Sequence, residues 1–196
     1  MSTREGVGRV GTALPEDHEL WAATQGGDRD AFTTLYHRHV DAVWRQAHHL
    51  TGSSAMAEDV LAATFLTAWR RRAEVRFTAD SALPWLLAVA GNEARTERRR
   101  SMRHQRLFRR LGSGPVVRDH SDSVAASVDD HRSLHRVLAT LERLPPAQRE
   151  VVELCIIADL AQSDAARALG IPEATVRSRI HRARTRLRAL LPEETR

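Results

Sequence analysis

Residues 165–176 read AARALGIPEATV, and this stretch predicts two short helices joined by a tight turn. Ala166 is small, as required where two helices cross closely, and Gly170 can adopt the positive φ that a tight turn needs. Ile171 and Val176 are apolar and are expected to fill the angle between the two helices. The pattern is typical of a helix-turn-helix.

The second of these helices, expected over about 173–190, has one apolar and one cationic face. Six arginines lie between Arg177 and Arg188, and Ser178 and His181 share the polar side with Arg177 and Arg182. A helix of this width fits the major groove of DNA, where arginine pairs with guanine edges and with phosphates. The residues favour DNA binding over the alternative, an ordinary helical hairpin whose basic side only faces water.

Upstream, apolar residues recur every three or four positions, as they do in helices packed into a bundle. One stripe covers residues 32–47 and a second runs from 54 to about 72. Ser54 is expected to cap the second of these helices, and Asp80 or Ser81 the helix that follows. Stacked stripes of this kind predict a helical bundle.

Changes in composition divide the chain into four parts. Residues 1–15 are expected to form a flexible tail, and residues 16–110 a helical domain. Residues 111–130 mix Gly, Pro, Ser and Asp without a sustained period, which predicts a flexible linker. Residues 131–196 are expected to form a second helical domain that contains the helix-turn-helix. No strand is predicted, so the expected fold class is all-α with two domains.

Composition excludes several classes of protein. The 196 residues carry a net charge of +5, and all thirty basic residues are arginine. Cys155 is the one cysteine, which excludes an internal disulfide and a cysteine-based zinc site and favours a reducing compartment. Residues 1–16 have no apolar core like that of a signal peptide, and no apolar run approaches the ~20 residues that span a bilayer. We expect a cytoplasmic protein that does not insert into membranes.

The positive charge is concentrated in two stretches. Residues 91–118 carry +7 and residues 166–196 carry +5, which suggests two separate anionic contacts. The first stretch follows PWLLAVAGN at residues 84–92, where Pro84 falls in a first helical turn and is tolerated. Asn92 offers both a donor and an acceptor to a base, and the arginines beyond it suit a phosphate backbone.

Four blocks together resemble the extracytoplasmic-function sigma factors, the small two-domain initiation subunits of bacterial RNA polymerase. Residues 57–70 are similar to region 2.2, and residues 85–92 to regions 2.3 and 2.4. Residues 144–151 resemble the start of region 4, and residues 174–184 resemble region 4.2. The blocks occur in the family's order and spacing over nearly the whole chain.

The resemblance implies the following functional residues. Those expected to contact the −35 element are Thr175, Arg177, Ser178, His181 and Arg182. Those expected to contact the −10 element are Trp85, Asn92, Arg95 and Arg99. Those expected to contact core polymerase are Glu58, Asp59, Leu61, Ala62 and Phe65.

The resemblance also implies a mechanism and partners. The expected partners are the clamp helices of the largest polymerase subunit, the flap of the second-largest subunit, promoter DNA and an anti-sigma factor. Capture of flipped −10 bases would offset unstacking, which costs a few kcal/mol per step, so opening needs no ATP. No cofactor, metal or catalytic residue is expected.

Five positions depart from the family pattern. Ala62-Ala63 replaces a usual Gln-Glu pair at the polymerase contact, and Gly91 replaces an arginine before Asn92. Thr96 stands where an aspartate is usual. Ala161 replaces a serine cap of the first helix of the helix-turn-helix, unless Ser163 caps a shortened helix.

Other functions find less support in the residues. The pairs His37/His39 and His48/His49 lack the four-residue spacing of a helical metal site, and Cys155 on an apolar face indicates a buried structural thiol. The adjacent carboxylates Glu58 and Asp59 have no nucleophile or Gly-rich loop beside them, so neither a catalytic site nor an RNA-modifying enzyme is indicated. A stand-alone helix-turn-helix regulator is the alternative function, but it would need a ligand pocket or a dimerisation helix in the first domain.

Overall fold

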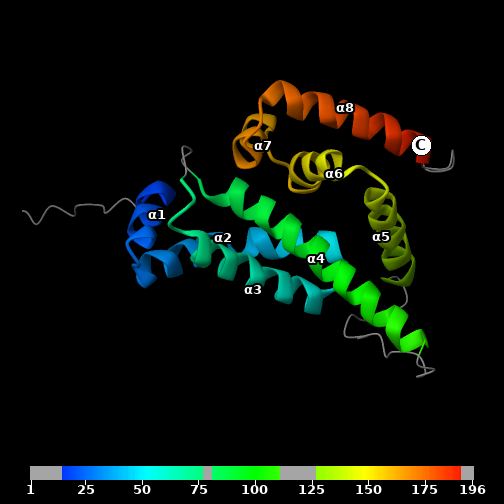
Figure 1. Cartoon of the computed structure of the whole chain (residues 1–196), viewed down its shortest axis with the longest axis horizontal. Helices are drawn as coiled ribbons and strands as arrows, with labels where there is room; N and C mark the ends of the chain where they lie inside the picture. Colours follow the sequence, from blue (N-terminus) through cyan, green and yellow to red (C-terminus); the bar gives the residue numbers. More distant parts are fainter. Residues whose placement is uncertain (1–14, 77–80, 111–126, 191–196) are drawn as a thin grey trace, which may run out of the picture.

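The computed structural model describes residues 15–76, 81–110 and 127–190, and the regular elements in these ranges are all helical (Figure 1). The elements in chain order are α1 (Asp17–Gln25), α2 (Arg29–Thr51), α3 (Ser54–Arg71), α4 (Leu83–Arg110), α5 (Ser127–Glu142), α6 (Pro146–Val152), the π-helical turn η1 (Glu153–Ile157), α7 (Gln162–Leu169) and α8 (Glu173–Leu190). The predicted all-α class is confirmed. The predicted tail and most of the predicted linker lie outside the described residues, and α5 begins at Ser127.

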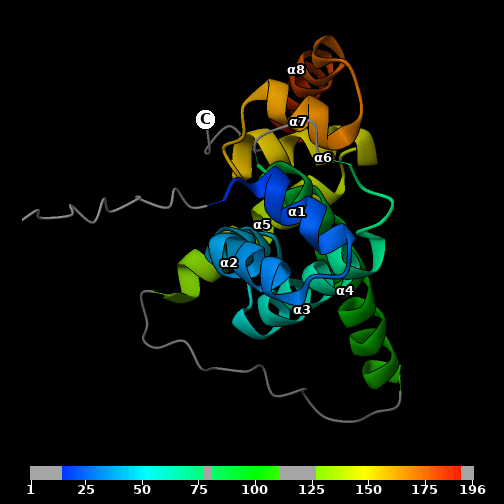
Figure 2. The ribbon, with the colours of Figure 1, turned by 90° about the vertical axis from the view of Figure 1, so that its left-hand side faces the viewer.

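Helices α2, α3 and α4 pack side by side because each presents one apolar stripe to the others (Figure 2). Val43, Val60 and Leu86 are at most 2% exposed. Gly52 ends α2 in the left-handed region at φ 68°, which leaves Ser53 extended and its hydroxyl positioned to accept from the N–H of Met56 at 3.4 Å. The predicted cap at Ser54 was therefore wrong by one residue.

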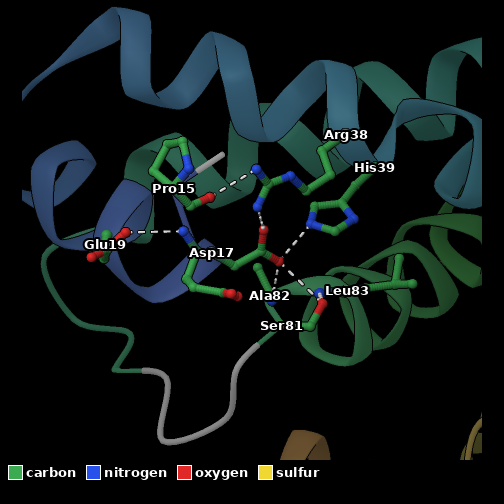
Figure 3. Close-up of polar contacts among 9 residues, drawn as sticks. Pro15, Asp17, Glu19, Arg38, His39, Ser81, Ala82 and Leu83 are labelled. Carbon is green, nitrogen blue, oxygen red and sulfur yellow. Dashed lines mark hydrogen bonds and ion pairs between the residues drawn. The ribbon is translucent and has the colours of Figure 1, made fainter. Parts of the chain in front are cut away.

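A buried carboxylate joins α1 to this bundle (Figure 3). Asp17 Oδ1 accepts from Arg38 at 2.6 Å, and its Oδ2 lies 2.7 Å from His39 Nε2. The same Oδ2 accepts from the backbone N–H of Ala82 at 2.7 Å and from the Ser81 hydroxyl at 3.1 Å. One side chain thus connects the start of α1, the middle of α2 and the entry to α4.

Helix α4 is the longest helix among the described residues, with 28 residues, and its C-terminal half extends beyond the end of α3 (Figure 1). At its start the Ser81 hydroxyl accepts from the N–H of Leu83 at 3.2 Å, as predicted for a serine cap. Pro84 lies in the first turn, also as predicted. Asp80, the other predicted cap, lies outside the described residues.

The helix-turn-helix forms where the sequence predicts it. Gly170 ends α7 with φ 64°, and Val176 is fully buried in the angle between α7 and α8. Helix α7 begins at Gln162 after Ala161, with no side-chain cap, so the alternative that Ser163 caps a shorter helix was wrong. The missing cap follows from the alanine, which has no acceptor on its side chain.

The two halves pack against each other rather than lying apart. Helix α7 and the turn η1 contact α4, and η1 also contacts α2. A single cluster of buried side chains includes Leu86 and Leu87 of α4 together with Val151, Leu154 and Ala165 of the second half. The sequence predicts two helical units, and the structure adds that they share a hydrophobic core.

Candidate nucleic-acid interface

Helix α8 presents a cationic face to solvent. Val176, Ile180 and Ala183 are buried against the rest of the second half, which fixes the rotation of the helix. Arg177, His181 and Arg182 are exposed on the other side, and Thr175 and Ser178 are half-buried. The five residues predicted for the −35 element therefore lie along one accessible helix of the kind that enters a major groove.

Arg177 is the most clearly positioned of the arginines on this face. Its side chain is 70% exposed, and its Nη2 lies 3.2 Å from Glu173 Oε1, one turn earlier on α8. An exposed pair of this spacing is weak, about 0.3–0.5 kcal/mol. The guanidinium is therefore oriented by Glu173 but can leave it for a base or a phosphate.

The residues predicted for the −10 element are distributed over different environments on α4. Asn92 and Arg99 are exposed. Trp85 is half-buried, and its ring packs edge to face on Trp21 of α1 with centroids 5.8 Å apart. It therefore supports the surface at the start of α4 as part of the core, while one side of the side chain reaches solvent.

Arg95, the fourth predicted −10 residue, faces the second half of the molecule. Its side chain is 12% exposed. Nη1 donates to Glu153 Oε2 and Nη2 donates to Asn92 Oδ1. Nη2 also lies 3.4 Å from Glu150 Oε1. In this structure two glutamates of α6 and η1 hold the Arg95 guanidinium, and the contact of Arg95 with the −10 element stays a prediction.

Glu153 is the most buried carboxylate of this cluster, with its side chain 4% exposed. Burial raises the pKa of Glu153 to about 7, and the guanidinium groups of Arg95 and Arg149 oppose this rise without cancelling it. Burial also lowers the pKa of Arg149, whose Nη2 donates to the carbonyls of Glu142 and Leu144 at 2.5 and 3.1 Å. Sequence reasoning missed Glu153, since nothing local distinguishes it from a solvated glutamate.

The residues predicted to contact core polymerase lie on α3, and four of them reach the surface. Glu58, Asp59 and Ala62 are exposed and Leu61 is half-buried. Phe65 is 5% exposed and its ring packs on Tyr36 with centroids 4.7 Å apart, so its contact with core polymerase stays a prediction. It lies in the core beneath the predicted surface because it falls on the apolar stripe that faces α2.

Leu66, next in the chain, was missed as a surface residue. Its side chain is 47% exposed, and it follows Ala62 by one helical turn. The i, i+4 spacing from Ala62 was the available signal. Leu66 extends the face of Glu58, Asp59 and Ala62 with the large apolar side chain that the two alanines at 62 and 63 do not supply.

The other expected site chemistries concern single residues. Cys155 is half-buried rather than fully buried, and burial raises the pKa of its thiol. His39, weighed as part of a metal pair, bonds to Asp17 instead. In the described ranges no group of three or more His, Cys, Asp or Glu residues is arranged to hold a metal. None of the helices described there combines the length and the hydropathy that a membrane span requires.

Comparison with known proteins identifies both halves. The family model for sigma-70 region 2 matches residues 35–104, and the model for sigma-70 region 4 matches residues 134–187. The ECF RNA polymerase sigma factor SigL of Mycobacterium tuberculosis is 35% identical over 159 residues, which cover 81% of this chain and 88% of SigL. The RNA polymerase sigma factor CarQ of Myxococcus xanthus is 34% identical and covers 85% of this chain and 92% of its own.

Solved structures show the same architecture. CnrH, in complex with the cytosolic domain of CnrY, matches 89% of this chain and 96% of its own with a TM-score of 0.58 and 29% identity. RpoE of Bartonella quintana, in complex with the anti-sigma factor NepR, shares the fold at a TM-score of 0.50 and 23% identity, over 81% of this chain and 95% of its own. The predicted resemblance is confirmed: the chain belongs to the extracytoplasmic-function sigma factors, the RNA polymerase subunits that direct the core enzyme to specific promoters and help to open the −10 element.

Proposed function

We propose a division of labour between the two halves of this sigma factor. Residues 131–196 form the −35 domain, which reads duplex DNA through Thr175, Arg177, Ser178, His181 and Arg182. The observation that carries this proposal is the orientation of α8, in which Val176, Ile180 and Ala183 are buried while Arg177, His181 and Arg182 are exposed. Arginine pairs bidentately with guanine in the major groove, at ~1–3 kcal/mol of discrimination per contact.

Residues 16–110 form the −10 domain, with Asn92 and Arg99 as the exposed contacts and Trp85 supporting them. Arg95 joins them once it leaves Glu150 and Glu153. The cationic second half of α4 follows the phosphate backbone of the same strand, which makes the affinity depend on salt. Of the predicted linker 111–130, residues 127–130 belong to α5.

The α3 face is proposed to bind the clamp helices of the largest polymerase subunit. Glu58, Asp59, Leu61 and Ala62 contribute to it, and Leu66 adds an apolar anchor of the kind that dominates interfaces. Region 4 is proposed to contact the flap of the second-largest subunit. Because RpoE of Bartonella quintana was solved with the anti-sigma factor NepR, an anti-sigma factor is proposed as a further partner of this chain.

The protein acts as a specificity subunit without catalysis of its own, in the cytoplasm where polymerase and chromosome meet. The alternative, a stand-alone regulator, is disfavoured by the α3 face, which such a regulator would not need. Reconstitution separates the two: the purified chain and core polymerase should give specific run-off transcripts. A regulator would bind a palindromic site without core polymerase and would give no such transcripts.

A further inference from the structure

Helix α4 turns its predicted DNA-contacting side partly toward the second half of the same molecule. The guanidinium of Arg95 is bound by Glu153 and Glu150, which lie 58 and 55 positions later in the chain. Asn92 is exposed, but its Oδ1 accepts from the same guanidinium. Two of the four predicted −10 residues are therefore already in contact: Arg95 binds the second half, and Asn92 binds Arg95.

Gly91 allows the Glu153 carboxylate to come close to α4. It lies inside α4, where glycine destabilises a helix relative to alanine and where no turn requires it. A Cβ at this position would lie 3.0 Å from Glu153 Oε2 and 3.5 Å from Arg95 Nη1. The missing side chain thus leaves the space that the Glu153 carboxylate occupies.

Further contacts join the two halves on either side of Gly91. The Gln46 amide of α2 donates to the backbone carbonyl of Glu153 at 3.0 Å. Farther along α4, Arg98 Nη2 lies 2.8 Å from Glu142 Oε1, on α5. Polar contacts from three helices of the second half, on top of the shared apolar core, indicate a defined interface rather than a chance encounter.

We propose that the free protein rests in a closed state in which Glu153, seated over Gly91, and Glu150 occupy Arg95, so that region 4 and the −10 strand compete for the same guanidinium. The proposal rests on the −10 role of Arg95 stated above. Closure keeps free protein from binding promoter strands, and separation of the two halves releases Arg95 for DNA. A partner that separates the halves therefore also switches on −10 binding.

The closed state is tested by an intramolecular distance in the free full-length chain. Spin labels go on cysteines at the exposed positions Thr33 and Thr185, with Cys155→Ala as the background. Wild-type protein should give one narrow distance distribution. Gly91→Gln favours the helix but fills the Glu153 site, so it should lower the ratio of closed to open molecules about tenfold. A broad wild-type distribution, or one unchanged by Gly91→Gln, overturns the proposal.

Controls separate opening from misfolding. Thr96→Gln makes a comparable change at an exposed position of α4 and should keep the narrow distribution, with helicity measured by circular dichroism for each variant. Glu150→Arg reverses a charge whose side chain is 31% exposed and faces Arg95, so it should open the molecule without burying a new group. Glu173→Arg reverses an exposed charge on α8, away from Arg95, and should leave the molecule closed.

DNA binding is measured separately, by fluorescence anisotropy with a random-sequence single-stranded oligonucleotide and no polymerase. Gly91→Gln should bind several-fold more tightly than wild type, and adding Arg95→Ala should remove that gain. An open Gly91→Gln variant without a gain in affinity leaves the closed state supported and overturns the −10 role of Arg95. A gain that survives Arg95→Ala overturns the competition for the guanidinium.

Discussion

The imidazole Nε2 of His39 lies 2.7 Å from Oδ2 of Asp17, and both side chains are buried. Burial by itself raises the pKa of Asp17, but hydrogen bonds from His39, from the N–H of Ala82 and from Arg38 outweigh it and hold that pKa well below its usual range. The ionised carboxylate is thus a structural element that holds α1, α2 and the start of α4 together.

Asp17→Asn should lower the free energy of unfolding by about 3 kcal/mol, because it removes the charge that these donors require. Because the folded-state pKa is depressed, the contribution of Asp17 is present at neutral pH and is lost as the pH falls below ~4. Urea unfolding at pH 7 and at acid pH measures both effects. The exposed Asp41→Asn serves as a control, and an equal loss there would contradict the role of Asp17.

The raised pKa of Glu153 predicts a pH dependence of the opposite sign. Arg95 and Arg98 from α4, and Arg149 and Glu150 from α6, surround this carboxyl. The folded state binds a proton more tightly than the unfolded state, so the contribution to stability is present below pH ~4.5 and is lost as the pH rises to about 7. The slope between these values is at most about 1.4 kcal/mol per pH unit.

The measurement for Glu153 is the difference between two unfolding profiles over this pH range, wild type and Glu153→Gln. Glu153→Gln has no titrating group at this position, so its free energy of unfolding should change less steeply with pH than that of wild type. The histidines titrate in both proteins, so their contributions cancel in the difference. The exposed Glu173→Gln is the matched control and should leave the wild-type slope intact. Parallel profiles for wild type and Glu153→Gln would rule out a raised pKa at this site.

Arg177→Ala should weaken transcription from promoters that depend on the −35 element while leaving association with core polymerase unchanged. The loss of one base contact predicts about a tenfold loss of −35 affinity. Filter binding to core polymerase and run-off transcription measure the two effects separately. Arg188→Ala, in the last turn of α8, is the control. Equal losses in both assays for Arg177→Ala would refute the proposed split between the halves.

Leu66→Asp should weaken binding to core polymerase about tenfold or more, because it places a charge in the apolar part of the proposed α3 face. The side chain is 47% exposed, so the thermal midpoint should change little. Leu107→Asp, at a 56% exposed position near the end of α4, provides the comparison. If both variants bound core polymerase as tightly as wild type, α3 would not be the docking surface.

Ala161→Ser should stabilise the protein by about 1 kcal/mol, since it supplies the missing N-cap of α7. The backbone of Ala161 is extended, with φ −58° and ψ 146°, so a serine hydroxyl there can accept from an amide of the first turn. Thermal unfolding measures the gain. Ala161→Val keeps an extended backbone but offers no acceptor, so a gain of the same size in that variant would point to another cause.

The sequence by itself determined the helical elements, the helix-turn-helix and the family. These features depend on local patterns: apolar residues at three- and four-residue steps, a glycine in the turn at Gly170, and short blocks in a fixed order. The bounds of α7 and α8 were predicted closely because Gly170 and Pro172 act locally. A glycine at this position ends one helix, and a proline directly precedes the first turn of the next. The cap at Ser53 was misplaced by one residue because adjacent serines are equivalent until the turn at Gly52 is known.

Only the tertiary structure decided which side chains are exposed and free to bind a partner and which are held by other residues of the chain. Arg95 looks like any arginine of a cationic stretch, but it bonds to Glu153, 58 positions away, because α4 and η1 pack together. Phe65, which is predicted to contact core polymerase, lies in the core between α3 and α2, and His39 lies beside Asp17. The position of each of these side chains depends on which faces of the helices pack together. The burial and the pKa of a side chain are set by the residues packed around it, so they cannot be inferred from the residue type alone.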